Sequence, residues 1–166
     1  MIAVLHAGCG GDPLPAWLGE CEEVRLDIDP AHRPHIVASM VALGDIGPFD
    51  AVVSQHSLEH LYRHEVKTAL CEFRRVLKPG GFAFIVVPDL EDVRPTDDVV
   101  YEAPCGPITG LDMYYGHQRK LEETPYMAHR TGFVKATLEG EFADAGFSRC
   151  EVRRVPDFNL IGVGIK

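Results

Sequence analysis

Short apolar runs rich in β-forming residues alternate with helix-like segments along the whole chain. This alternation constrains the fold most, because it is typical of a parallel sheet covered by helices on both faces. The 166 residues suffice for one domain with a single hydrophobic core. We therefore predict one doubly wound α/β domain over residues 1–166, with a mostly parallel sheet of seven strands.

The expected elements follow from the apolar patterning and from the turn residues that bound it. Strands are expected at residues 2–5, 23–27, 36–39, 50–54, 82–87, 151–155 and 161–165. Helices are expected at residues 15–19, 65–77 and 134–145. The run 82–87 shows no polar alternation, so we expect it to be buried on both faces of the sheet. Residues 89–131 are rich in proline and predict an irregular insertion that serves as a substrate segment or lid.

Charge and composition narrow the classes of partner. The formal net charge of −9 disfavours a duplex nucleic acid, whose phosphates the chain would repel. No apolar run approaches the roughly 20 residues of a membrane-spanning helix, and no leader peptide is evident, so we expect a cytoplasmic protein without a membrane partner. The five cysteines are scattered and form no C-x-x-C pair, which indicates reduced thiols.

Two features stand at the carboxyl ends of the first two expected strands. Gly8 and Gly10 follow the first strand, and the acid Asp27 ends the second. The carboxyl ends of parallel strands meet at one edge of a sheet, where bare backbone N–H groups and a carboxylate suit the ribose diol of a nucleotide-like ligand. The alternative is that Asp27 and Asp29 only form a turn before Pro30. The order of strand, glycines, strand and acid favours the ligand site.

Four segments of the sequence carry a resemblance to a known family. They are V-L-H-A-G-C-G-G-D at 4–12, R-L-D-I-D-P at 25–30, F-D-A-V-V-S-Q-H-S-L-E-H-L at 49–61 and F-R-R-V-L-K-P-G-G at 73–81. In order and spacing the chain resembles the class I (Rossmann-like) S-adenosylmethionine-dependent methyltransferases of the small-molecule, type 11-like group. The resemblance implies S-adenosylmethionine as the cofactor and a closing hairpin whose last strand is antiparallel.

The resemblance also implies a set of cofactor-binding residues. The glycine turn would pass beneath the methionyl part, Asp27 would hold both ribose hydroxyls, and Ile28 would pack on the adenine. The complete predicted set is His6, Ala7, Gly8, Cys9, Gly10, Asp27, Ile28, Ser39, Met40, Ser54 and Gln55.

Three features depart from the family pattern. His6 stands where the family usually has an acid that seats the methionine ammonium, and Ser39 stands where it often has an acid bound to the adenine amino group. The chain also begins at its first strand, without the N-terminal lid helices of the family. These departures leave open a non-catalytic binding or partner module with the same fold. They also leave open a homodimer, or a partner subunit that supplies the lid.

Two other chemistries fit the sequence less well. The nicotinamide fingerprint requires glycine or alanine where Pro13 stands, which disfavours an oxidoreductase. Residues 56–60 match the zinc-protease pattern H-x-x-E-H, but they follow a strand instead of lying within a long helix. L-E-H-L at this location is common in the methyltransferases that the chain resembles. We therefore predict no metal site.

Methyl transfer is an in-line displacement that requires few chemical groups. His56 lies just after the fourth strand and is the candidate general base, with a capping or packing role as the alternative. Tyr114, Tyr115, His117 and His129 are the candidate substrate contacts. No N-P-P-[YF] motif follows the fourth strand, which disfavours methylation of DNA bases or glutamine. We expect a small-molecule acceptor, or an acceptor presented on another protein.

Overall fold

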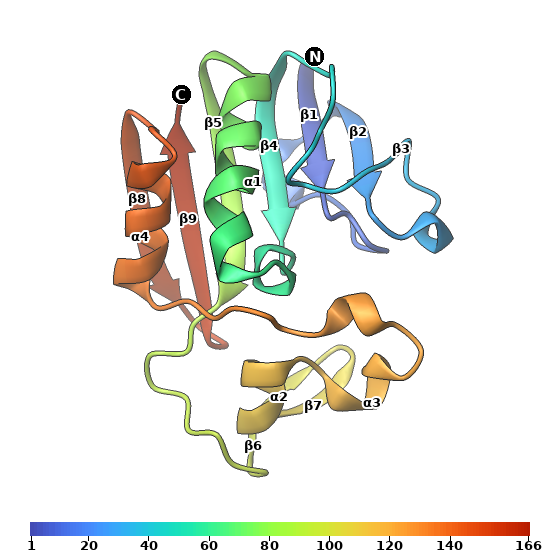
Figure 1. Cartoon of the computed structure of the whole chain (residues 1–166), viewed down its shortest axis with the longest axis vertical. Helices are drawn as coiled ribbons and strands as arrows, with labels where there is room; N and C mark the ends of the chain where they lie inside the picture. The colour runs from blue at the N-terminus through green and yellow to red at the C-terminus, as the bar shows by residue number, and fades with distance from the viewer.

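The computed structural model describes residues 1–166 and confirms the predicted α/β fold (Figure 1). Seven strands form one sheet in the order β3-β2-β1-β4-β5-β9-β8. Their bounds are β1 Ile2–Ala7, β2 Cys21–Asp27, β3 Ile36–Val37, β4 Phe49–Gln55, β5 Leu77–Pro88, β8 Arg149–Val155 and β9 Asn159–Ile165. β9 runs antiparallel to both of its neighbours, and the other pairings are parallel.

The strand order reverses at β1. The chain moves outward from β1 to β2 and β3, and then returns to the other side of β1 to form β4 and β5. Such a switch point separates the connections on either side and leaves a crevice beyond the carboxyl ends of the strands. The ends of β1, β2 and β4 therefore meet where the sequence predicts the ligand site.

Two long helices cover one face of the sheet, α1 (Arg63–Val76) and α4 (Lys135–Asp144), and both lie in front of it in Figure 1. The buried residues of α1 recur at helical spacing, as the sequence predicted: Val66, Ala69, Leu70, Phe73 and Val76. Together with the sheet they form the main core, a cluster of 23 buried residues.

The opposite face carries only one three-residue 3₁₀ helix, η1 (Ala16–Leu18), at the place of the brief helix expected at 15–19. The Trp17 ring of η1 lies 5.1 Å from the ring of Phe84 and 6.3 Å from that of Phe82. Phe82, Phe84 and Val86 are consequently only half-buried, while the residues between them are buried. The prediction that 82–87 is buried on both faces is wrong, because no long helix covers this side.

The insertion is more regular than predicted and lies beyond the carboxyl ends of the strands, at the bottom of Figure 1. It contains a hairpin of β6 (Val99–Ala103) and β7 (Gly106–Thr109), followed by α2 (Gly110–Tyr115), α3 (Gln118–Leu121) and the 3₁₀ helix η4 (Pro125–Met127). Two further 3₁₀ helices, η2 (Pro30–His32) and η3 (Leu58–His60), follow β2 and β4. None of the helices combines the length and the apolar composition that crossing a membrane requires.

Candidate cofactor and acceptor site

The turn after β1 needs glycine for two physical reasons. Gly8 and Gly10 have φ angles of 67° and 46°, in the left-handed region that side chains rarely adopt. A Cβ atom on Gly8 would also overlap the Ser57 hydroxyl, which donates a hydrogen bond to the Gly8 carbonyl at 2.9 Å. The N–H groups of Gly8 and Cys9 donate to the Leu26 carbonyl. The turn is therefore fixed against β2, and open space remains beside Gly10 and Gly11, where a Cβ atom would meet nothing within 4 Å.

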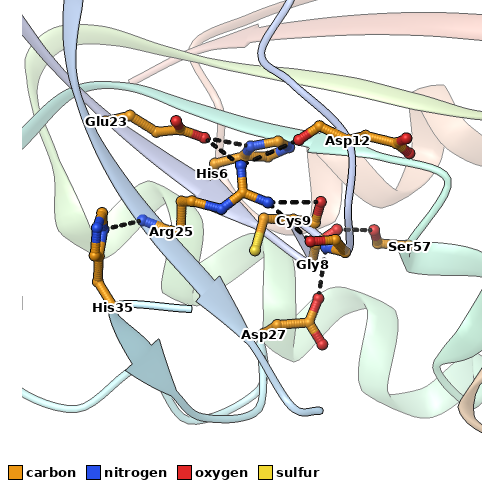
Figure 2. A network of polar contacts seen from close by, with 10 residues as sticks. His6, Gly8, Cys9, Asp12, Glu23, Arg25, Asp27, His35 and Ser57 are labelled. Carbon is orange, nitrogen blue, oxygen red and sulfur yellow. Dashed lines mark hydrogen bonds and ion pairs between the residues drawn. The ribbon is translucent and has the colours of Figure 1, made fainter. Parts of the chain in front are cut away.

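Asp27 ends β2 and reaches this turn (Figure 2). Its Oδ2 atom accepts a hydrogen bond of 2.8 Å from the Gly10 N–H, and its Oδ1 atom accepts one of 2.9 Å from the Asp29 N–H. The residue is 8% exposed and lines the large cavity at this edge of the sheet. The acid and the glycine turn therefore meet at one place, as their positions at the ends of adjacent strands predicted.

Arg25 stabilises the turn through hydrogen bonds from its side chain, a role that was not predicted from the sequence. Its guanidinium donates to the carbonyls of Gly10 at 2.8 Å and Asp12 at 3.1 Å, and to Glu23 Oε1 at 3.1 Å (Figure 2). Alternate residues of a strand share a face, so a cation two positions before Asp27 was an available signal. Arg25 satisfies carbonyls that the sharp turn leaves without partners in secondary structure.

His6 does not line the cavity, contrary to the cofactor role that the resemblance implied. It is 1% exposed, and its Nδ1 atom lies 2.8 Å from Glu23 Oε1. The strand period explains the correction, because the side chain of His6 lies on the same face of the sheet as Glu23 and Arg25 and gathers with them (Figure 2). Burial lowers the pKa of His6 below its usual 6.5, and this outweighs the opposing effect of Glu23.

The cavity beyond the strand ends has a volume of about 410 Å³, within the range of small-ligand sites. Most of the predicted cofactor residues line it: Gly8, Gly10, Asp27, Ile28, Ser39, Met40 and Gln55. Ala7, Cys9 and Ser54 do not, because they are fully or almost fully buried behind this lining. Asp12, Asp29 and Ser57 also line the cavity and were not predicted to do so.

His56, the candidate base, lines the same cavity directly after β4. It has a φ angle of 49°, an uncommon conformation for a residue other than glycine, of the kind that clusters at functional sites. Its Nδ1 atom lies 3.5 Å from Oε1 of the buried Glu59. Burial alone would lower the pKa of His56, but the contact with Glu59 outweighs it and raises this pKa above 6.5.

The far wall of the cavity comes from the insertion, but not from the residues that we predicted. It is formed by Lys120, Thr124, Tyr126, Met127 and Arg130. The predicted substrate contacts Tyr114, Tyr115, His117 and His129 do not line it.

The placement of these four residues follows from the insertion's own folding. The Tyr114 hydroxyl donates to the Val93 carbonyl, and Tyr115 is 59% exposed. His117 precedes α3, and the His129 ring packs 5.2 Å from that of His60. Short helices within the insertion set these directions, and the sequence did not reveal them.

Comparison with solved structures identifies the fold. A S-adenosylmethionine-dependent methyltransferase from Archaeoglobus fulgidus matches with a TM-score of 0.69 and 14% identity, over 99% of this chain and 86% of that one. Burkholderia thailandensis 1,6-didemethyltoxoflavin-N1-methyltransferase was solved with 1,6-didemethyltoxoflavin and S-adenosylhomocysteine. It matches with a TM-score of 0.63 and 18% identity, over 99% of this chain and 71% of that one. Human N-acetylserotonin methyltransferase, solved with S-adenosylmethionine, matches with a TM-score of 0.64 and 12% identity, over 99% of this chain and 47% of that one. The chain has the class I methyltransferase fold.

A family match covers the N-terminal part of the chain. Residues 5–85 match the family described as a methyltransferase domain, a span that runs from β1 into β5 and includes the glycine turn and Asp27. The family match and the fold support the predicted resemblance to the class I S-adenosylmethionine-dependent methyltransferases, a class whose cofactor is S-adenosylmethionine. No curated protein sequence matches the chain. The chain spans 51% of another matched structure, from Nostoc punctiforme.

Proposed function

We propose that this chain transfers the methyl group of S-adenosylmethionine to a small-molecule acceptor bound in the cavity between the strand ends and the insertion. The observation that carries the proposal is the contact of Asp27 with the Gly10 N–H at the mouth of this cavity. It brings a carboxylate suited to a ribose diol next to a turn with open space beside Gly10 and Gly11.

The residues present fit the cofactor in shape and chemistry. Ile28 is an apolar side chain that is 48% exposed although it lines the cavity, and Met40 lines the cavity with it. These two side chains offer an apolar surface for the flat adenine. Gly10 and Gly11 have open space where a Cβ would lie, which leaves room beside the turn for the methionyl part.

The chemistry needs the acceptor to be aligned and water to be excluded. The bound cofactor supplies an electrophilic methyl group on a sulfonium. A hydroxyl acceptor aligned with that methyl group would form the new carbon–oxygen bond, with S-adenosylhomocysteine as the leaving group, and would release its proton to His56. His56 lines the cavity and Glu59 orients its imidazole, as a general base requires. Orientation alone contributes about 7–11 kcal/mol to such reactions.

Calorimetric titration with S-adenosylmethionine and S-adenosylhomocysteine tests the proposal. Wild type should bind both, and Asp27→Asn should bind at least about tenfold more weakly, because hydrogen bonds to a charged group contribute about 1.5–3 kcal/mol. Asp45→Asn is the matched control, because Asp45 is exposed and lies outside the cavity. Absence of heat with wild type would contradict the proposal.

Turnover separates an enzyme from the non-catalytic module. Incubation with labelled cofactor and a panel of phenols, amines and thiols should yield a labelled product with wild type and at least about a hundredfold less with His56→Ala. Cofactor binding without product from any acceptor class would favour the binding module instead.

A further inference from the structure

A second cluster of side chains lies at the edge of the cavity and takes no direct part in the proposed transfer. Glu59 and His60 belong to η3, and His129 follows η4 in the distant insertion. One ligand-type atom from each of the three lies within 4.8 Å of the others. The backbone keeps the segments together, because the Arg130 N–H donates to the Glu59 carbonyl at 2.8 Å and the Thr131 N–H does so at 3.2 Å.

Both histidines present a ring nitrogen to this cluster. His60 Nδ1 lies 3.2 Å from the Ala128 carbonyl, and His129 Nδ1 lies 2.9 Å from the Met113 carbonyl. A carbonyl only accepts, so each Nδ1 donates its proton to the carbonyl and Nε2 is the ring nitrogen left for a metal ion. His60 Nε2 is buried and has no hydrogen-bond partner. Metal-binding histidines are usually oriented by this second-nitrogen contact.

Glu59 has a buried carboxylate oxygen that lacks a hydrogen-bond partner. It is 2% exposed, its Oε1 atom faces His56, and its Oε2 atom has no hydrogen-bond partner. A buried carboxylate oxygen without a partner is costly, and a bound cation is one way to compensate it.

We propose that Glu59, His60 and His129 bind a divalent first-row transition-metal ion such as Zn²⁺. Two imidazole nitrogens and one carboxylate form a donor set of catalytic zinc sites, whereas Mg²⁺ and Ca²⁺ prefer oxygen ligands. Three protein ligands leave at least one position of a tetrahedral ion open. His60 lines the cavity, so the ion lies at the cavity wall.

This site revises the reading of the H-x-x-E-H pattern in the sequence. The ion uses the Glu59 and His60 of that pattern, and takes its third ligand from His129 instead of His56. The fold brings His129 to η3, which explains why sequence spacing gave no sign of the site. The proposal stands independently of the methyl-transfer function, because it needs no cofactor in the cavity.

Titration of the metal-stripped protein with Co²⁺ and Zn²⁺ tests the site. We expect one equivalent of Co²⁺ to bind, with visible d–d absorption, and Zn²⁺ to displace it while Mg²⁺ does not. His129→Ala and Glu59→Gln should each weaken binding at least about tenfold, since each removes one of three ligands. His64→Ala should bind as wild type does, because His64 is an exposed histidine on α1.

Two outcomes would overturn the metal site. One is the absence of stoichiometric binding by wild type, and the other is binding that survives in both variants, which would mark adventitious contact with surface histidines. X-ray absorption of the Zn²⁺-loaded wild type keeps the proposal falsifiable even where a variant fails to fold. Two imidazoles with oxygen ligands would support it, and a thiolate in the shell would contradict it. Calorimetry with S-adenosylmethionine on the metal-free protein reports separately on the proposed function.

Discussion

At the scale of single residues, Gly8 has little freedom to change. Gly8→Ala would place a side chain in the left-handed region, at about 1–2 kcal/mol, and would push the Ser57 hydroxyl away from the turn. We expect a loss of at least about 2 kcal/mol in the free energy of unfolding, measured by urea denaturation, together with weaker binding of S-adenosylmethionine. Gly11→Ala is the control, because a Cβ there meets no atom within 4 Å. Equal stability of the two variants would contradict this account.

The buried His6 side chain leads to a prediction about how the free energy of unfolding depends on pH. Burial lowers its pKa below the 6.5 expected in the unfolded chain, so on acidification the unfolded chain takes up a proton before the folded one does. The stability associated with neutral His6 is therefore complete above pH 6.5 and is lost as the pH falls through the lowered pKa. His6→Gln removes this titration. Its free energy of unfolding should decline less steeply than that of wild type between about pH 7 and pH 5. Parallel curves would show that His6 does not titrate in this way.

Residues differ in how far the sequence predicts their roles. Gly8, Gly10 and Asp27 were predictable, because strand ends and the order of the chain determine where they meet. Arg25 and His129 were not, because their roles depend on the direction of a side chain and on how a distant segment folds. Sequence patterning reports which strand end a residue occupies, and tertiary packing decides what it faces.

At the scale of elements, the close packing of α4 on β9 requires glycine at position 164 of the strand. A Cβ on Gly164 of β9 would lie 2.6 Å from Phe142 Cδ1 of α4 and 2.8 Å from Phe147 Cδ1. Gly164→Ala should therefore cost about 1–3 kcal/mol of unfolding free energy by overpacking the core. Gly140→Ala, at an exposed position of α4 with open space around it, should instead stabilise by about 0.5–1 kcal/mol. Thermal denaturation should show a lower melting temperature than wild type for Gly164→Ala and a higher one for Gly140→Ala.

The limits of sequence patterning at this scale are clearest in β5. Its apolar run correctly predicted a strand inside the sheet, between β4 and β9. It could not reveal that η1 is too short to cover Phe82, Phe84 and Val86, because an apolar residue on a half-covered face looks the same in the sequence as one on a buried face. The insertion was misjudged for a related reason, since its hairpin and helices are too short for a periodic pattern to emerge.

At the scale of the whole molecule, the sheet and the insertion bury hydrophobic clusters of unequal size. The sheet with α1 and α4 buries a cluster of 23 residues, whereas the insertion buries only Val93, Ile108 and Met113 as a cluster of its own. Less buried apolar surface means a lower free energy of local opening. The insertion is therefore expected to open without the sheet, which would admit ligands to a cavity that its own residues close on one side.

Native-state hydrogen exchange measures the free energies at which the insertion and the sheet open. Amides of β6, β7 and α2 should exchange through local opening at lower free energy than those of β4 and β5, whose protection should approach that of global unfolding. S-adenosylhomocysteine should slow exchange over residues 120–130, which supply the far wall of the cavity, because a ligand that binds only the closed form shifts the equilibrium toward it. Equal protection of the sheet and the insertion would mean that the two clusters unfold as one unit, so that ligands enter the cavity without the insertion opening.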